Sequence, residues 1–110
     1  MILKDLLDYL STQLSVGVYA EAPDQTTGYV LLDQTATSNA NHITTTTIAV
    51  QSYGATLYGA MALNEAVKEA MEGFAEQPQV ASVKLETDYN FTNTATKQYR
   101  WQAVYHITHY

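Results

Sequence analysis

Residues 42–74 read HITTTTIAVQSYGATLYGAMALNEAVKEAMEGF, a β-branched stretch that leads almost directly into an amphipathic one. Thr, Ile and Val pack well on a pleated sheet and lose side-chain freedom in a helix, so residues 42–53 predict a long strand. Gly54 interrupts that pattern, and apolar residues then recur at helical spacing. The stretch therefore predicts a strand and then a helix. Thr56 is the expected N-cap, with Ser52 as the alternative, and Gly73 is the glycine expected to end the helix.

Periodic segments lie on both sides of this unit. A leucine stripe predicts a helix from Ile2 to Leu14, with Gly17 just past its end. Strands are predicted at Val16–Ala20, Tyr29–Asp33, Val80–Phe91 and Tyr99–His109, and the last two are expected to pair as an antiparallel hairpin. The predicted fold class is α+β, a single domain over residues 1–110. Its mixed or antiparallel sheet of about four to five strands is packed by two helices, in the order α-β-β-β-α-β-β.

Alternation also predicts which side chains face the interior. In the strand Val80–Phe91, the odd-numbered residues from Val83 to Phe91 are expected on the buried face, and Ser82, Lys84, Glu86 and Asp88 on the solvent face. The expected core consists of Leu6, Leu10, Ile48, Val50, Leu57, Met61, Val67, Met71, Val83, Leu85, Trp101 and Tyr105.

The polar tract QTATSNAN, from Gln34 to Asn41, has no periodicity and predicts an exposed loop. The Thr-rich start of the strand that follows carries no charge and no proline, and is therefore expected to be an unprotected sheet edge. Together these stretches predict a surface that contacts a neighbouring subunit. The predicted interface residues are Gln34, Thr37, Asn39, Asn41, His42, Thr44, Thr45 and Thr47.

Composition excludes several classes of function. The net charge is −6, and the five Lys and Arg residues are scattered, whereas phosphate binding needs clustered positive charge. The chain has no Cys, which excludes disulfides and thiolate chemistry. Nine Tyr residues suit half-buried positions and protein interfaces. The N-terminal stretch is amphipathic, not a signal peptide, and no apolar run is long enough to span a membrane, so no membrane partner is expected.

No pattern of catalytic or ligand-binding residues emerges. His106 and His109 lie three residues apart in a predicted strand and should point to opposite faces, which disfavours a metal site. The glutamates of the second helix fit a solvated face better than a carboxylate pair. No serine lies in a nucleophile motif, and no glycine-rich loop has phosphate-binding spacing. We therefore predict no enzyme activity, no cofactor and no metal.

The order and style of these elements resemble a known family. The resemblance is carried by a leucine-rich first helix, the stretch VYAEAP at residues 18–23, the strand YVLLD, the strand and helix IAVQSYGATLYGAMALNEAVKEAM, and the aromatic end YRWQAVYHITHY. The chain resembles the tail-terminator or tail-completion proteins of long-tailed bacteriophages and prophages. These proteins are also labelled minor capsid or head–tail joining proteins.

The resemblance implies a virion structural protein that is assembled in the bacterial cytoplasm and lies at the head–tail junction. Copies would form a ring, typically a hexamer, on the head-proximal end of the tail tube, and would contact the tail tube protein and a head-side neck protein. DNA would pass through the ring without tight binding. The alternative is a small monomeric or dimeric α+β module that binds a ligand or regulates a partner, with a hydrolase as a third and weaker reading.

Overall fold

The computed structural model describes residues 1–25 and 27–110 and has the predicted α+β architecture. The elements are α1 (Ile2–Gln13), β1 (Gly17–Tyr19), β2 (Tyr29–Ala40), β3 (Ile43–Gly54), α2 (Leu57–Phe74), β4 (Val80–Asn90) and β5 (Tyr99–His109). Five strands form one mixed sheet in the order β1-β2-β3-β5-β4, in which β1 and β2 are parallel and the other neighbours antiparallel. The predicted element order and the hairpin at the end of the chain are confirmed.

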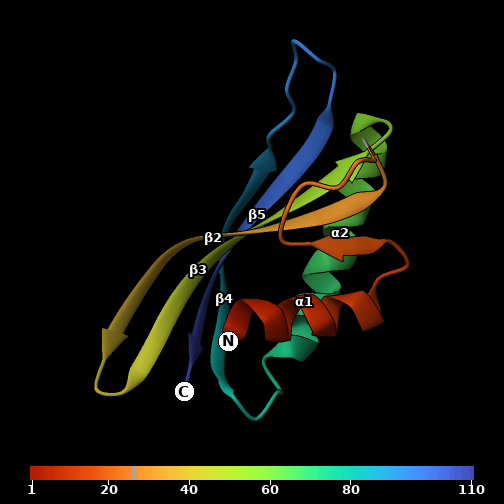
Figure 1. Cartoon of the computed structure of the whole chain (residues 1–110). Helices are drawn as coiled ribbons and strands as arrows, with labels where there is room; N and C mark the ends of the chain where they lie inside the picture. Colours follow the sequence, from red (N-terminus) through yellow and green to blue (C-terminus); the bar gives the residue numbers. More distant parts are fainter. Residues whose placement is uncertain (26) are drawn as a thin grey trace.

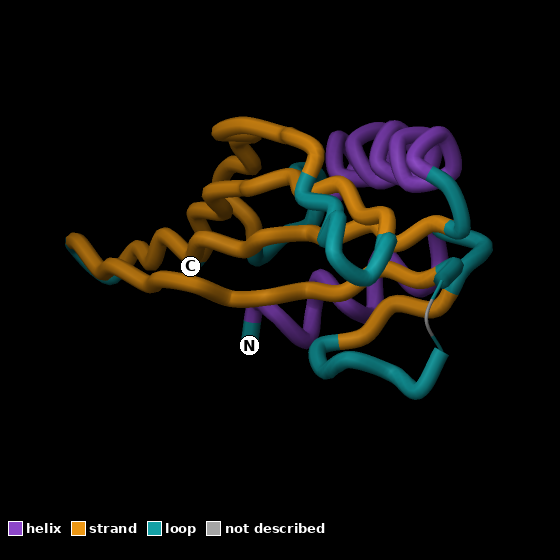
Figure 2. Tube along the Cα trace, turned by 90° about the horizontal axis from the view of Figure 1, so that it is seen from above, coloured by secondary structure: helices purple, strands orange, loops and turns teal. Residues whose placement is uncertain are grey.

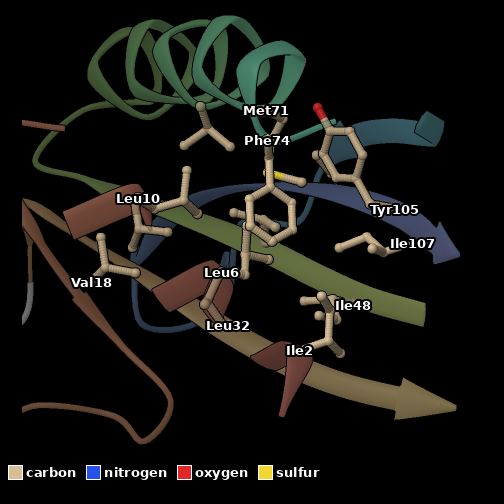
Figure 3. Close-up of a cluster of buried hydrophobic side chains, with 14 of the residues drawn as sticks. Ile2, Leu6, Leu10, Val18, Leu32, Ile48, Met71, Phe74, Tyr105 and Ile107 are labelled. Atoms are coloured by element: carbon tan, nitrogen blue, oxygen red, sulfur yellow. The ribbon is translucent and has the colours of Figure 1, made fainter. Parts of the chain in front are cut away.

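The core lies between one face of the sheet and both helices (Figure 3). Helix α1 contributes Ile2, Leu6 and Leu10, which recur every fourth residue on one face. The two helices also contact each other, because the Tyr9 ring packs on Phe74 at 5.3 Å and its hydroxyl donates to the Ala70 carbonyl at 2.9 Å. The sheet supplies its half of the core from alternate residues of β2, β3 and β5.

The ends of α2 agree only in part with the sequence pattern. The Thr56 hydroxyl accepts from the Gly59 amide at 2.9 Å, so the predicted N-cap is confirmed. Gly73 lies inside the helix and does not end it, since Ala75 caps the helix in a right-handed conformation. A Cβ atom at position 73 would displace the Tyr9 hydroxyl, so packing against α1 favours glycine here. At the end of α1, Leu14 is the cap in extended backbone, and Gly17 instead begins β1.

Three residues expected in the core are exposed: Leu57, Met61 and Leu85. The buried stripe of α2 passes through Ala60, Asn64, Val67, Met71 and Phe74, and the apolar side chains at 57 and 61 lie beside it. Asn64 belongs to this stripe and is one of the most buried residues of the helix. Because Asn is polar, the stripe cannot be recognised from apolar spacing in the sequence. Val83 and Trp101 are half-buried, and the other predicted core residues are buried.

A register shift between Leu85 and Thr87 reverses the faces of β4. Before the shift Leu85 pairs with Tyr105 on the helix side, and after it Asp88 pairs with Ala103 on the same side. Asp88 was expected on the solvent face, and that expectation is wrong because strict alternation fails at a bulge. The shift brings a carboxylate next to α2.

Candidate assembly surface

A long β-hairpin projects from one end of the molecule. In Figure 1, β2 and β3 continue side by side past the helices to a turn at the lower left, and Figure 2 shows the same projection from above. We call residues 34–47 the arm. All the residues of the predicted interface lie in it: Gln34, Thr37, Asn39, Asn41, His42, Thr44, Thr45 and Thr47. The tertiary structure therefore brings them together on one hairpin.

The predicted loop at 34–41 is wrong, because β2 extends to Ala40 and pairs with β3 along the whole arm. Only two residues connect the strands, since Ala40 pairs with Ile43. Asn41 and His42 have φ values of 51° and 65°, the left-handed conformation that a two-residue hairpin turn requires at both positions. Asn suits this conformation well, whereas a residue with a bulky side chain adopts it at a cost.

The Thr residues of the arm are held by side-chain hydrogen bonds. The Thr44 hydroxyl donates to Asn39 Oδ1 at 2.6 Å across the hairpin. On the other side of β3, Thr46 contacts His109 Nε2 at 2.9 Å and Thr47 contacts His106 Nδ1 at 3.0 Å. These contacts and the backbone ladder make the base of the arm a rigid element.

The Thr-rich strand was expected from its sequence to be an edge of the sheet, but it lies inside the sheet. Thr44 pairs with Asn39 of β2 on one side and with His109 of β5 on the other, so the backbone of β3 is occupied on both sides. Thr45 and Thr47 are half-buried, and their side chains contact Thr108 and His106. These residues therefore offer side chains, but no free backbone, to a neighbour.

The unprotected edge belongs to β2. Strand β1 covers only residues 29–31, so from Leu32 to Ala40 no other strand of the described residues pairs with β2 on that side. Beyond Asp33 this edge has no charged residue and no proline. The opposite edge, β4, carries Lys84, Glu86 and Asp88 and two register shifts, which are features that hinder edge-to-edge pairing. The β2 edge is thus the one suited to contact another chain.

The sequence pattern missed the edge residues Thr35, Ala36, Ser38 and Ala40. They lack the apolar alternation of a half-buried strand, and all four are exposed. A weak signal was present, since Asn41 and His42 separate two Thr-containing stretches of similar length. Asn at the first turn position is typical of such hairpins.

On the sheet face opposite the helices, side chains of neighbouring strands contact one another. Tyr29 stacks on Tyr53 with ring centroids 4.3 Å apart, and burial is the main cause that raises the pKa of Tyr29. The Tyr53 hydroxyl donates to Gln51 Oε1 at 2.9 Å, and Gln51 Nε2 donates to Gln102 Oε1 at 2.8 Å. Both Gln side chains are buried, so this network stiffens the sheet and leaves few free polar groups for a ligand.

The three histidines do not converge. His42 lies at the tip of the arm, while His106 and His109 bind Thr47 and Thr46 on opposite faces, as their spacing predicted. His106 Nε2 also lies 3.4 Å from Glu86. Among residues 1–25 and 27–110, no three His, Asp or Glu side chains are grouped as metal ligands would be.

The described part of the chain contains no helix with the length and apolar character needed to cross a membrane. In comparisons with known proteins, the chain matches no family model, no curated protein and no solved structure. The resemblance to tail-terminator proteins therefore stays a prediction.

Proposed function

We propose that this chain is a structural subunit of a ring that caps the head-proximal end of a phage tail tube and helps to join the tail to the head. In this proposal the subunit contacts further copies of itself, the tail tube protein and a head-side neck protein. It is not an enzyme, and its place is the head–tail junction of a virion assembled in the bacterial cytoplasm.

The arm is the observation that carries this proposal. A paired hairpin that projects beyond its own core buries little apolar surface within the subunit, and a hairpin gains stability when a further surface packs on it. The free β2 edge adds a row of backbone donors and acceptors that a neighbour could pair with. Both features favour assembly over an isolated monomer.

The charge of the chain supports the same role. A net charge of −6 repels nucleic-acid phosphates, so a ring of such subunits would let DNA pass through without holding it. The arm has no Asp, Glu, Lys or Arg, and the next charged residue along the chain is Glu65. Copies of this acidic chain can therefore meet at the arm without strong repulsion.

The alternative, a small ligand-binding or regulatory module, makes different demands on the structure. Such a module needs a concave site with converging polar groups. The open face of the sheet does not provide such a site, because its buried polar groups are paired with one another. The long uncovered arm has no evident use in a monomer that only binds a small ligand.

Sedimentation velocity over a wide range of protein concentration tests the proposal, with electron microscopy of the largest species. We expect wild-type protein to form a closed ring with a central opening. The variant Ala36→Lys/Ser38→Lys places two charges beside the free β2 edge and should abolish the ring without unfolding the subunit, since both residues are exposed.

The matched control is Ser82→Lys/Thr87→Lys, which places the same charges at exposed positions on the already charged β4 edge. It should assemble like wild type. Lysines at Thr45 and Thr47 are a poorer test, because those side chains are half-buried and bonded to Thr108 and His106. A wild-type protein that stays monomeric at every concentration and binds a small ligand would support the alternative instead.

A further inference from the structure

A hollow of about 210 Å³ lies at the other end of the molecule from the arm. Its wall is formed by the first turns of α2, which contribute Tyr58, Met61 and Asn64. The sheet contributes Asp88 of β4 and Trp101 of β5. The register shift in β4 is what turns Asp88 towards this hollow.

The rim of the hollow is apolar and open to solvent. Tyr58 is 81% exposed and Met61 is 42% exposed, although α2 buries other apolar side chains completely. Trp101 lies half-buried beside them. Tyr, Trp and Met are the residue types most enriched where proteins contact each other, so this rim has the composition of a binding surface.

The floor of the hollow is polar and rich in acceptors. Asp88 Oδ2 accepts from Asn64 Nδ2 at 2.9 Å, from Lys68 Nζ at 3.2 Å and from Trp101 Nε1 at 3.3 Å. These bonds fix the orientation of the Trp101 indole. Asn64 is 1% exposed, and its Oδ1 atom is buried with no hydrogen-bond partner. The acceptors that a second chain could reach are the carboxylates of Asp88 and Glu65, whose side chains are 25% and 70% exposed at the hollow.

The turn of the arm has the complementary chemistry. Asn41 and His42 carry side-chain N–H donors, and Ile43 presents an apolar side chain that is exposed at the tip. The arm has no acidic residue that the carboxylates of Asp88 and Glu65 would repel, in a chain where acidic residues outnumber basic ones 11 to 5. The turn therefore offers the hollow side-chain donors and an apolar side chain, and no acidic group that its carboxylates would repel.

An arm cannot reach the hollow of its own subunit. The turn extends past the His109 end of β5, whereas Trp101 lies towards the opposite end of that strand. The molecule is 44 Å long, and Figure 1 shows the arm and the start of α2 at opposite ends of it. A contact between turn and hollow must therefore join two copies. Repeated head to tail, such a contact forms a ring when the rotation between neighbouring subunits closes.

We propose that the hollow formed by Tyr58, Met61, Asn64, Asp88 and Trp101 receives the turn at residues 41–43 of a second copy. This inference rests on the proposed ring and adds, beside the free β2 edge, two surfaces that join its subunits. Each subunit inserts its arm into the next one, Ile43 packs against the rim, and the side-chain donors of the turn meet the carboxylates of Asp88 and Glu65.

Disulfide trapping tests the contact directly, because the natural chain has no Cys. The double variant Ile43→Cys/Met61→Cys should give, under mild oxidation, a ladder of covalent multimers that ends in a closed ring and disappears on reduction. Each single variant can form no more than a dimer. The matched control Ile43→Cys/Glu69→Cys moves the second thiol along α2 to an exposed position outside the hollow and should give no ladder.

A second variant measures the energetic role of the rim. Met61→Asp should leave the thermal unfolding temperature close to that of wild type and weaken self-association by on the order of tenfold or more, the usual effect of losing a central interface residue. Rings that form normally in Met61→Asp, and equal trapping in the two double variants, would overturn this contact and leave the ring itself intact. If no variant and no wild-type sample assembles, the ring and the contact are both wrong.

Discussion

Gly54 lies against the backbone of Ala60 so closely that a Cβ atom at position 54 would overlap the Ala60 amide nitrogen. This contact is where β3 ends and α2 turns back over the sheet. The Thr56 N-cap and the short connection between the two elements hold the backbones together at this point. The glycine is needed for close approach.

Gly54→Ala is expected to lower the free energy of unfolding by about 1–3 kcal/mol, because an added methyl group must displace backbone that cannot move freely. Urea denaturation measures the change. Gly59→Ala is the control, since its Cβ would lie 3.2 Å from the exposed Thr56 hydroxyl, and alanine is the better helix former. A loss at position 59 equal to that at position 54 would contradict the close approach as the cause.

Val67→Asp and Met61→Asp are expected to behave differently, although both residues were predicted in the core. Val67 is fully buried, so an unpaired carboxylate there costs several kcal/mol and should unfold the subunit. Met61 is exposed, so its Asp variant should fold. Circular dichroism and thermal melting separate the two variants. A folded Val67→Asp protein would show that this part of α2 does not belong to the core.

Ionised Asp88 is expected to stabilise the fold, so the free energy of unfolding should decrease in acid. Burial alone would raise its pKa, but hydrogen bonds from Lys68, Asn64 and Trp101 hold the pKa of Asp88 below its usual value of 3.8. A lowered pKa in the folded state means that the stabilisation is present at neutral pH and is lost as the pH falls below about 4.

Asp88→Asn should therefore cost about 1–3 kcal/mol at neutral pH and progressively less in acid. Urea denaturation of both proteins at a series of pH values is the measurement. A gap between wild type and variant that stays constant down to low pH would show that the charge of Asp88 does not contribute.

Tyr105 is expected to make stability fall in alkali. Burial raises the pKa of Tyr105 to about 12, and the charges of Asp88, Glu72 and Glu65 add to the shift. The unfolded chain ionises this hydroxyl near its usual pKa of 10.0, so stability is lost as the pH rises from about 10 towards 12. Tyr105→Phe should have a flatter stability curve in this range, measured by urea denaturation, with tyrosinate absorbance reporting one fewer late-titrating group.

His42→Gly is expected to keep or increase the stability of the subunit, by up to about 1 kcal/mol, because glycine adopts the left-handed conformation of residue 42 at no steric cost. His42→Val should destabilise the turn for the opposite reason. Thermal melting ranks the three proteins. If His42→Gly were the least stable, the conformation of the turn would not be the limiting feature of the arm.

Much of the fold was predictable because it is encoded locally. The helices follow from apolar spacing, the start of α2 follows from Thr56, and the strand order along the chain follows from alternation. The residues predicted as an interface do lie together, but not for the predicted reason. They were assigned to a loop and an edge strand, whereas they form a paired hairpin whose free edge is β2.

The sequence by itself determined which segments are helix or strand, because side-chain periodicity and capping act over a few neighbouring residues. Tertiary structure alone decided that β3 lies inside the sheet, that Asp88 faces α2, and that Met61 is exposed. Those outcomes depend on which strands pair and where a bulge shifts the register. Such pairings join residues far apart in the chain, so no local pattern records them.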